Sequence, residues 1–263
     1  MNDADCVALL QWALPRLHLR WEGFRRVRGQ VCKRIARRMS ELGSAEVGEY
    51  RQRLELDPQE WRHFDSLCRV TISRFHRDRL VFERLGELLA RRMSTGEGKV
   101  LRVWSAGCAS GEEPYTVAIL FRRRLLPVAP GSRLAVVATD VDAQLLERAR
   151  IGCYARGSLR ELPEEWREES FERVDGEWCI KARFREGIEW RCEDLRERMP
   201  DGPFAVILCR NLVFTYFDDL LQRRLLGQLL SRLGEGGLLV LGSHETLPGD
   251  RLRRLEPGVP IYG

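Results

Sequence analysis

Two acidic residues follow a glycine-containing loop in the segment LRVWSAGCASGEEPYTVAILF, residues 101–121. Its apolar spacing predicts a strand, a loop and a helix. Gly107 and Gly111 are expected to let a ligand lie against the main chain, because they carry no side chain. The amides of the first helical turn suit a carboxylate, whereas Glu112 and Glu113 would repel a phosphate and attract a positive group. The segment therefore favours S-adenosylmethionine, which carries an amino group, a carboxylate and a sulfonium but no phosphate. A tight turn with a favourable charge pattern is the plainer alternative.

A third acidic residue ends the next predicted strand. The apolar run LAVVAT, residues 134–139, is followed by Asp140. A carboxylate at the end of the second strand of such a unit can accept hydrogen bonds from both hydroxyls of a ribose. We therefore expect Asp140 to bind the sugar of the cofactor.

The composition describes a soluble intracellular protein. The chain has 263 residues, of which 44% are hydrophobic and 32% charged, enough for one large domain or two small ones. It contains no apolar run long enough to cross a membrane, and its first residues are acidic where a signal peptide needs bases. We expect a cytoplasmic protein without membrane insertion.

The eight cysteines are widely scattered, with no CxxC pair and no Cys/His cluster of zinc spacing. In the cytoplasm they are expected to be reduced rather than paired, and no metal site is predicted. They are Cys6, Cys32, Cys68, Cys108, Cys153, Cys179, Cys192 and Cys209.

Positive charge is concentrated in the first third of the chain. Residues 1–98 hold 19 Lys and Arg against 14 Asp and Glu, whereas residues 99–263 hold 25 of each. A helix is predicted from Phe24 to Leu42, with its apolar residues on one face and Arg26, Lys33 and Arg37 near the opposite face. An acidic protein surface is the expected partner. A solvated face that only aids solubility is the alternative, and nucleic acid is not expected because interleaved aromatic residues are lacking.

The rest of the chain predicts an α/β protein with a mainly parallel, doubly wound sheet. Residues 1–78 are predicted to form a small helical domain followed by a linker motif, and residues 79–263 a cofactor-binding domain. A flexible loop is expected at 94–98. Predicted strands alternate with helices in the second part, which is typical of a parallel sheet covered on both faces. The sequence ERVDGEWCIKARF predicts an antiparallel hairpin insertion at about 170–189.

Several long motifs in order resemble the CheR-type family of chemoreceptor methyltransferases. They are TISRFHRD, VWSAGCASGEEPYTVAI, ATDVDAQLLERARIGCY, ILCRNLVFTYFD and LGSHETL. The resemblance covers nearly the whole chain, from about Phe24 to Tyr262. It implies a Rossmann-like methyltransferase that uses S-adenosylmethionine, releases S-adenosylhomocysteine and forms methyl esters on glutamates of a receptor's cytoplasmic helical bundle. It also implies that the hairpin insertion corresponds to a subdomain that grips a tethering peptide in some members.

The resemblance further implies roles for individual residues. In the family the linker motif is close to TNxTxFFR, so Thr71 stands where the family has Asn, Ser73 where it has Thr, and His76 where it has the second Phe, while Arg77 matches. The motif is expected to contact the cofactor, and Arg77 to orient the acceptor carboxylate. The remaining expected cofactor contacts are Gly107, Glu112 or Glu113, Asp140, Asp194 and Leu195 near the adenine, and Arg210 and Asn211 of the CRN motif.

The residue that faces the methyl group is left open. The commoner family form is CRNxxIYFD, whereas CRNLVFTYFD places Tyr216 one residue later, so either Tyr216 or Thr215 could take this position. Two other functions compete with a glutamate methyltransferase. One is a cofactor-binding signalling module without catalysis, and the other is a methyltransferase that acts on another protein or on RNA.

Overall fold

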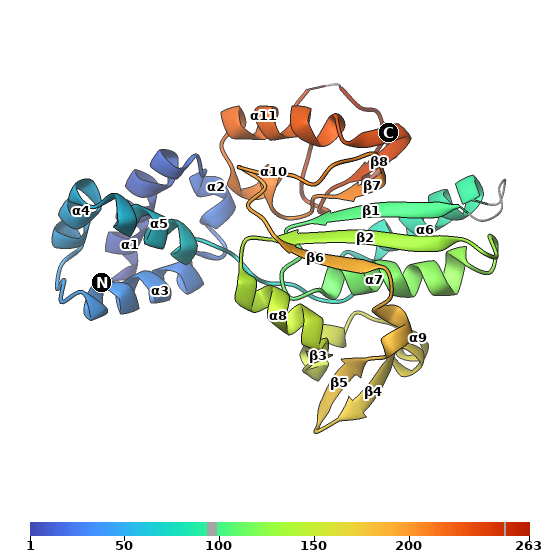
Figure 1. Ribbon diagram of the computed structural model, residues 1–263. Helices are drawn as coiled ribbons and strands as arrows, with labels where there is room; N and C mark the ends of the chain where they lie inside the picture. Colours follow the sequence, from blue (N-terminus) through green and yellow to red (C-terminus); the bar gives the residue numbers. More distant parts are fainter. Residues whose placement is uncertain (94–98, 250) are drawn as a thin grey trace. The chain divides into compact units, whose positions relative to one another are not determined.

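The chain divides into two compact units in the computed structural model, which describes residues 1–93, 99–249 and 251–263 (Figure 1). The first unit is Met1–Thr71 with Thr215–Arg224, and the second is Ile72–Phe214 with Leu225–Gly263. The boundary lies at residue 71, whereas the sequence placed it at 78, because Phe75 of the linker packs in the core of the second unit. The loop expected at 94–98 lies outside the described residues.

The first unit is helical. Its helices are α1 (Asp3–Ala13), α2 (Trp21–Phe24), α3 (Arg28–Glu41), α4 (Val47–Leu56) and α5 (Pro58–Leu67). The predicted amphipathic helix is confirmed in α3, where Val31, Ile35 and Met39 are buried at helical spacing. This helix begins at Arg28, so Arg26 lies in the turn before it and not on its face.

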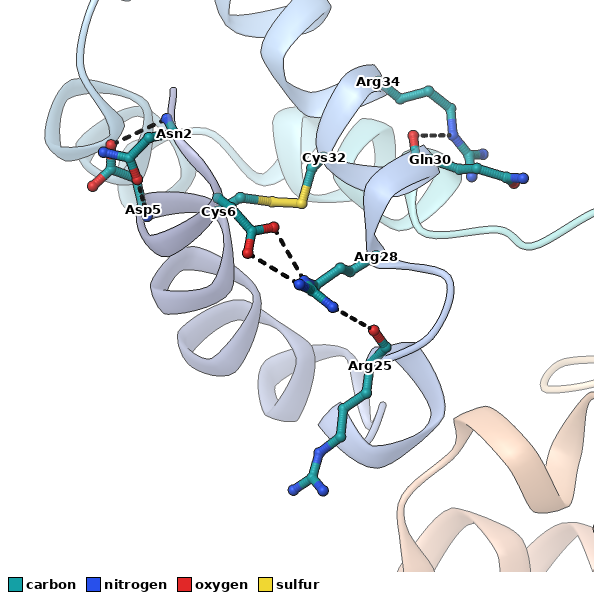
Figure 2. The surroundings of a disulfide bond; sticks show 9 residues. Asn2, Asp5, Cys6, Arg25, Arg28, Gln30, Cys32 and Arg34 are labelled. Carbon is teal, nitrogen blue, oxygen red and sulfur yellow. Dashed lines mark hydrogen bonds and ion pairs between the residues drawn. A yellow bond between two sulfur atoms is a disulfide. The ribbon is translucent and has the colours of Figure 1, made fainter.

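Four of the cysteines form disulfides, so the expectation that all are reduced is wrong. Cys6 and Cys32 join α1 to α3 (Figure 2), and Cys153 and Cys179 join two strands of the second unit. Beside the first disulfide, Arg28 donates to both carboxylate oxygens of Asp3, at 3.1 and 3.0 Å. Both pairs are 26 residues apart in sequence, so the folded chain brings them together and local spacing gave no signal.

The second unit contains the predicted mainly parallel sheet. Its strands are β1 (Val100–Ala106), β2 (Arg133–Asp140), β6 (Ile188–Cys192), β7 (Phe204–Leu208), β8 (Leu233–Val240), β9 (Arg254–Glu256) and β10 (Val259–Tyr262). Their order is β6-β2-β1-β7-β8-β10-β9. The first five strands of this order, from β6 through β2, β1 and β7 to β8, pair in parallel with their neighbours. Strand β10 is antiparallel to β8 and to β9. The α/β fold class is confirmed, and the antiparallel edge was not predicted.

Helices cover the sheet as the alternation of elements predicted. They are α6 (Arg79–Met93), α7 (Glu112–Leu120), α8 (Ala143–Ile151), the short α10 (Val213–Tyr216) and α11 (Asp219–Leu230). Val103 of β1 belongs to one buried cluster with residues of α6 and α7, and the next residue, Trp104, is also fully buried. Since successive strand residues point to opposite faces, both faces of the sheet are covered. Within the described residues, no helix is long and apolar enough to span a membrane.

The predicted hairpin insertion is confirmed and is larger than expected. Strands β4 (Phe171–Val174) and β5 (Glu177–Ile180) are joined by the Asp-Gly turn, whose two residues have positive φ. A third strand, β3 (Cys153–Tyr154), pairs with β5, and helix α9 (Glu164–Ser170) precedes β4 (Figure 1). We call β3, β4, β5 and α9 the insertion.

The disulfides predict the thiol content of the protein. When it is purified without reductant and then denatured, we expect four cysteines to react with a thiol reagent, namely Cys68, Cys108, Cys192 and Cys209, and all eight to react after reduction. Each 26-residue cross-link should stabilise the oxidised fold by about 3–4 kcal/mol. Eight reactive thiols before reduction would contradict the pairing.

Candidate active site

Three parallel strands end side by side and bring the candidate residues to one edge of the sheet. Ala106 of β1 pairs with Thr139 of β2, and Ser105 pairs with Leu208 of β7. The chain leaves β1 toward β2 on one side, and β7 lies on the other. The carboxyl edge at such a point is where open α/β sheets bind ligands.

The glycine loop is shaped by the packing of the protein itself. Gly107 and Gly111 have φ of 76° and 90°, a region that strongly favours glycine. A Cβ at Gly107 would lie 2.5 Å from Leu212 Cδ2, and one at Gly111 would lie 2.8 Å from Ala149 Cβ. The missing side chains make room for neighbouring side chains, and the expected approach of a ligand to this main chain stays a prediction.

Asp140 holds the glycine loop through its carboxylate. Its Oδ2 accepts from the Ala109 amide at 2.8 Å, and its Oδ1 accepts from the Asp142 amide at 3.0 Å. The carboxylate is therefore turned toward the loop, and its expected contact with a ribose stays a prediction.

The two acids of the first turn of α7 point to different partners. Glu112 is 3% exposed and accepts from the Ser110 hydroxyl at 3.0 Å. Burial raises the pKa of Glu112 above its ordinary value, although hydrogen bonds from Ser110 and Ser73 act against the shift. Glu113 accepts from the Ser105 hydroxyl at 2.7 Å and from an arginine of the CRN motif.

That arginine, Arg210, is the centre of a buried ionic network. Its guanidinium donates to Glu113 at 2.9 Å, to the Asp78 carboxylate at 2.8 Å and to the Arg77 carbonyl at 2.6 Å. Burial alone would raise the pKa of Asp78, but the charge of Arg210 and hydrogen bonds from Ser243 outweigh it and lower that pKa. The Nε of Arg210 is buried and has no hydrogen-bond partner among the described residues.

A second carboxylate organises the loop that follows β7. Glu245, 3% exposed, accepts from the amides of Asn211 at 2.7 Å, Leu212 at 3.2 Å and Gly242 at 2.7 Å. Asn211 has a φ of 53°, a left-handed conformation that asparagine tolerates. Sequence reasoning assigned no role to Glu245 or Asp78; both lie in motifs that carry the family resemblance, LGSHETL and TISRFHRD, and this was the signal that could have found them.

The linker motif reaches the network through its last residues. The Arg77 carbonyl binds Arg210, while the Arg77 side chain donates from Nη1 to the Ile72 carbonyl at 2.9 Å. His76 is fully buried, and burial lowers its pKa, which favours the neutral ring. Thr71 is exposed and is the last residue of the first unit's opening segment, so the structure does not group it with Ser73 and Arg77.

The expected adenine-binding residues follow β6. Asp194 accepts from its neighbour Arg196, whose Nη2 lies 2.7 Å from Oδ2, and Leu195 is 8% exposed. The carboxylate that replaces the family's amide is thus already paired with a guanidinium. Its contact with adenine stays a prediction.

Tyr216 and Thr215 belong to the first unit, where residues 18–24 hold their main chain. The Arg20 amide donates to the Tyr216 carbonyl at 2.8 Å, and Arg20 Nε donates to the Thr215 carbonyl at 3.0 Å. The Phe24 and Tyr216 rings lie 5.1 Å apart. A Cβ at Gly23 would come within 2.3 Å of the Thr215 carbonyl oxygen, so this approach requires glycine.

The cations of residues 26–38 are of two kinds, those paired within the first unit and those exposed on its surface. Arg28, Arg34 and Arg38 are used within the first unit; Arg38, for example, donates to the buried Glu60 at 3.1 and 2.7 Å. Lys33 and Arg37 are exposed on α3, and Arg37 lies 3.6 Å from the exposed Glu41. Together with Arg26 in the preceding turn, they remain the candidates for partner binding.

Comparison with known proteins identifies the family. The profile described as "CheR methyltransferase, SAM binding domain" matches residues 71–257. The chain belongs to the CheR methyltransferase family. It is 35% identical over 227 residues to a chemotaxis protein methyltransferase of Salmonella typhimurium, covering 83% of this chain and 76% of that one. It is 33% identical over 243 residues to the Escherichia coli chemotaxis protein methyltransferase, covering 89% and 82%. The Listeria monocytogenes chemotaxis protein methyltransferase is 33% identical over 202 residues, covering 76% and 74%.

The residues of this CheR-family protein fit its cofactor, S-adenosylmethionine. The Asp140 carboxylate is an acceptor, the type of group that a ribose needs, and Arg210 Nε, which has no partner among the described residues, is a donor of the type that a carboxylate needs. Arg210, Asp78 and Glu113 carry one positive and two negative formal charges, an excess that favours a positive ligand such as a sulfonium or an ammonium. The chemistry of these side chains is therefore compatible with the cofactor.

Proposed function

We propose that this chain transfers the methyl group of S-adenosylmethionine to glutamate side chains in the cytoplasmic helical bundle of a chemoreceptor or related signalling protein. The observation that carries the proposal is its similarity, over 83% and 89% of its length, to proteins named as chemotaxis methyltransferases. The product is a glutamyl methyl ester, together with S-adenosylhomocysteine.

The reaction needs positioning more than proton transfer. When bound, the cofactor supplies a methyl group on a positively charged sulfur. A glutamate side chain has an ordinary pKa of about 4.3 and is already ionised at neutral pH, so in-line attack on this methyl carbon needs no general base. The protein's task is to hold both reactants in line and to exclude water while opposite charges neutralise.

Within this proposal, the residues at the sheet edge hold the cofactor. Asp140 accepts from the ribose hydroxyls, and Glu112 or Glu113 faces a positive group. The other proposed contacts are Thr71, Ser73, Gly107, Asp194, Leu195, Arg210 and Asn211. Arg77 orients the carboxylate of the acceptor through charge-assisted hydrogen bonds, and Tyr216 borders the methyl group. Arg26, Lys33 and Arg37 attract the acidic surface of the acceptor protein.

The proposed acceptor is tested by following a labelled methyl group. The protein is incubated with methyl-labelled S-adenosylmethionine and the membrane fraction of its source organism. We expect a labelled protein that releases methanol in mild base, because a carboxyl ester is base-labile. Base-stable protein label would show another acceptor atom, and ribonuclease-sensitive label would show RNA. Cofactor binding by calorimetry without any labelled product would favour a signalling module without catalysis.

Arg77→Ala tests the orienting role of the guanidinium. The loss of a charge-assisted hydrogen bond should lower the rate of methyl transfer roughly 10- to 100-fold. The dissociation constant of S-adenosylmethionine, measured by calorimetry, should change much less. Arg79→Ala is the matched control, because Arg79 is exposed and pairs only with Glu83 at the start of α6 in the described contacts. Equal losses in transfer and in cofactor binding would contradict the orienting role.

Reversal of the exposed cations tests the partner surface. The triple change of Arg26, Lys33 and Arg37 to Glu should raise the KM for the acceptor protein about tenfold or more at low salt, and less at high salt. The control reverses Arg53, Arg62 and Arg223, which are exposed at other positions of the first unit, and makes the same change in net charge. If both variants keep the parent's KM, or if both lose affinity equally, the basic surface is not the docking site.

A further inference from the structure

The insertion touches the glycine loop through one buried tyrosine. Tyr154, the last residue of β3, is 3% exposed, and its hydroxyl donates to the Ser110 carbonyl at 2.7 Å. A Cβ at the adjacent Gly111 would lie 3.2 Å from the same hydroxyl oxygen. The hydroxyl therefore supports the loop that leads into α7.

The ring of the same tyrosine contacts the linker motif. Tyr154 and Phe75 meet edge to face with their centroids 4.8 Å apart, and Phe75 also meets Phe171 of β4 at 5.1 Å. Pairs with this geometry stabilise each other beyond the area that they bury. Phe75 is thus held between two strands of the insertion.

Polar contacts attach the neighbouring linker residues to the same insertion region. The Phe75 amide donates to the Ser158 carbonyl at 3.0 Å, and Arg74 pairs with Glu161 at 2.9 Å. The His76 ring lies 5.1 Å from the ring of Trp166 in α9. The next two residues of the linker hold Arg210, so the insertion sets the path of the chain into the ionic network.

The backbone of Tyr154 is itself fixed by the small sheet. Tyr154 pairs with Trp178 of β5, and the preceding residue, Cys153, is bonded through sulfur to Cys179 of that strand. Burial raises the pKa of Tyr154 well above its ordinary value, so the hydroxyl stays protonated and remains a donor. The small sheet therefore fixes the residue that contacts both the glycine loop and the linker motif.

We propose that Tyr154 is a positioning residue for the cofactor, through which the insertion holds the glycine loop and the linker motif in their binding conformation. The proposal rests on the cofactor site described above and not on the identity of the methyl acceptor. It assigns the insertion a part in cofactor affinity in addition to any contact that it makes with a partner.

The test compares two buried tyrosines whose hydroxyls donate to different main-chain carbonyls. Tyr115 is 1% exposed, and its hydroxyl donates to the Ala149 carbonyl of α8 at 2.8 Å and not to the main chain of the glycine loop. Tyr154→Phe and Tyr115→Phe thus each remove one buried hydrogen bond of similar length. The two variants should therefore lower Tm by similar amounts. We expect Tyr154→Phe to weaken the binding of S-adenosylmethionine and S-adenosylhomocysteine about tenfold by calorimetry, and Tyr115→Phe to change it by less than about twofold.

A second variant keeps the test decisive if the first folds poorly. Glu161→Gln breaks the partly exposed ion pair with Arg74 and leaves the core intact, so it should weaken cofactor binding by a few-fold. Equal cofactor affinities in Tyr154→Phe and Tyr115→Phe, or a Glu161→Gln protein that binds like the parent when Tyr154→Phe cannot be folded, would overturn the proposal. If the parent binds the cofactor but methylates no glutamate, the proposed function fails while this comparison still decides the role of Tyr154.

Discussion

The site depends on the ion pairs and hydrogen bonds of the buried Arg210 guanidinium. A cation that is 8% exposed costs several kcal/mol unless acceptors surround it. Those acceptors come from the linker, at Arg77 and Asp78, and from the first turn of α7, at Glu113. A single residue that follows β7 therefore fixes two segments that are far away in sequence, and removal of any one acceptor would leave a buried N–H of the guanidinium without that partner.

Carboxylates hold the remaining loops of the sheet edge by accepting from main-chain amides. Glu245 accepts from three amides around the end of β7 and the end of β8, and Asp140 accepts from two around the glycine loop. Hydrogen bonds to a charged acceptor are stronger than those between neutral groups. The site is thus built on fixed main chain, which suits a reaction that requires alignment rather than proton transfer.

Local patterns in the sequence were enough to predict the regular elements. The strands, the covering helices, the Asp-Gly hairpin and the position of Asp140 can all be read from periodicity and strand ends. Pairings between distant segments could not be predicted in this way. The disulfides, the support of Ser110 by Tyr154 and the anchoring of Arg210 by Asp78 join residues 26 to 132 positions apart. The packing of Leu212 against Gly107 could not be predicted either, because Leu212 comes from a loop on another strand.

Helix α10 crosses the boundary between the two units and ends at Tyr216. Helix α10 continues directly from the loop held by Glu245, yet its last residues are bound by Arg20 and packed against Gly23 and Phe24 of the helical unit. A side chain proposed to border the methyl group is therefore fixed by the unit that carries the exposed cations of α3. Only four residues separate Tyr216 from Asn211. A displacement of the residues that hold Tyr216 would therefore have to change the backbone conformation of these four residues. The residue proposed to face the methyl group and the cations proposed to bind the acceptor therefore belong to the same unit.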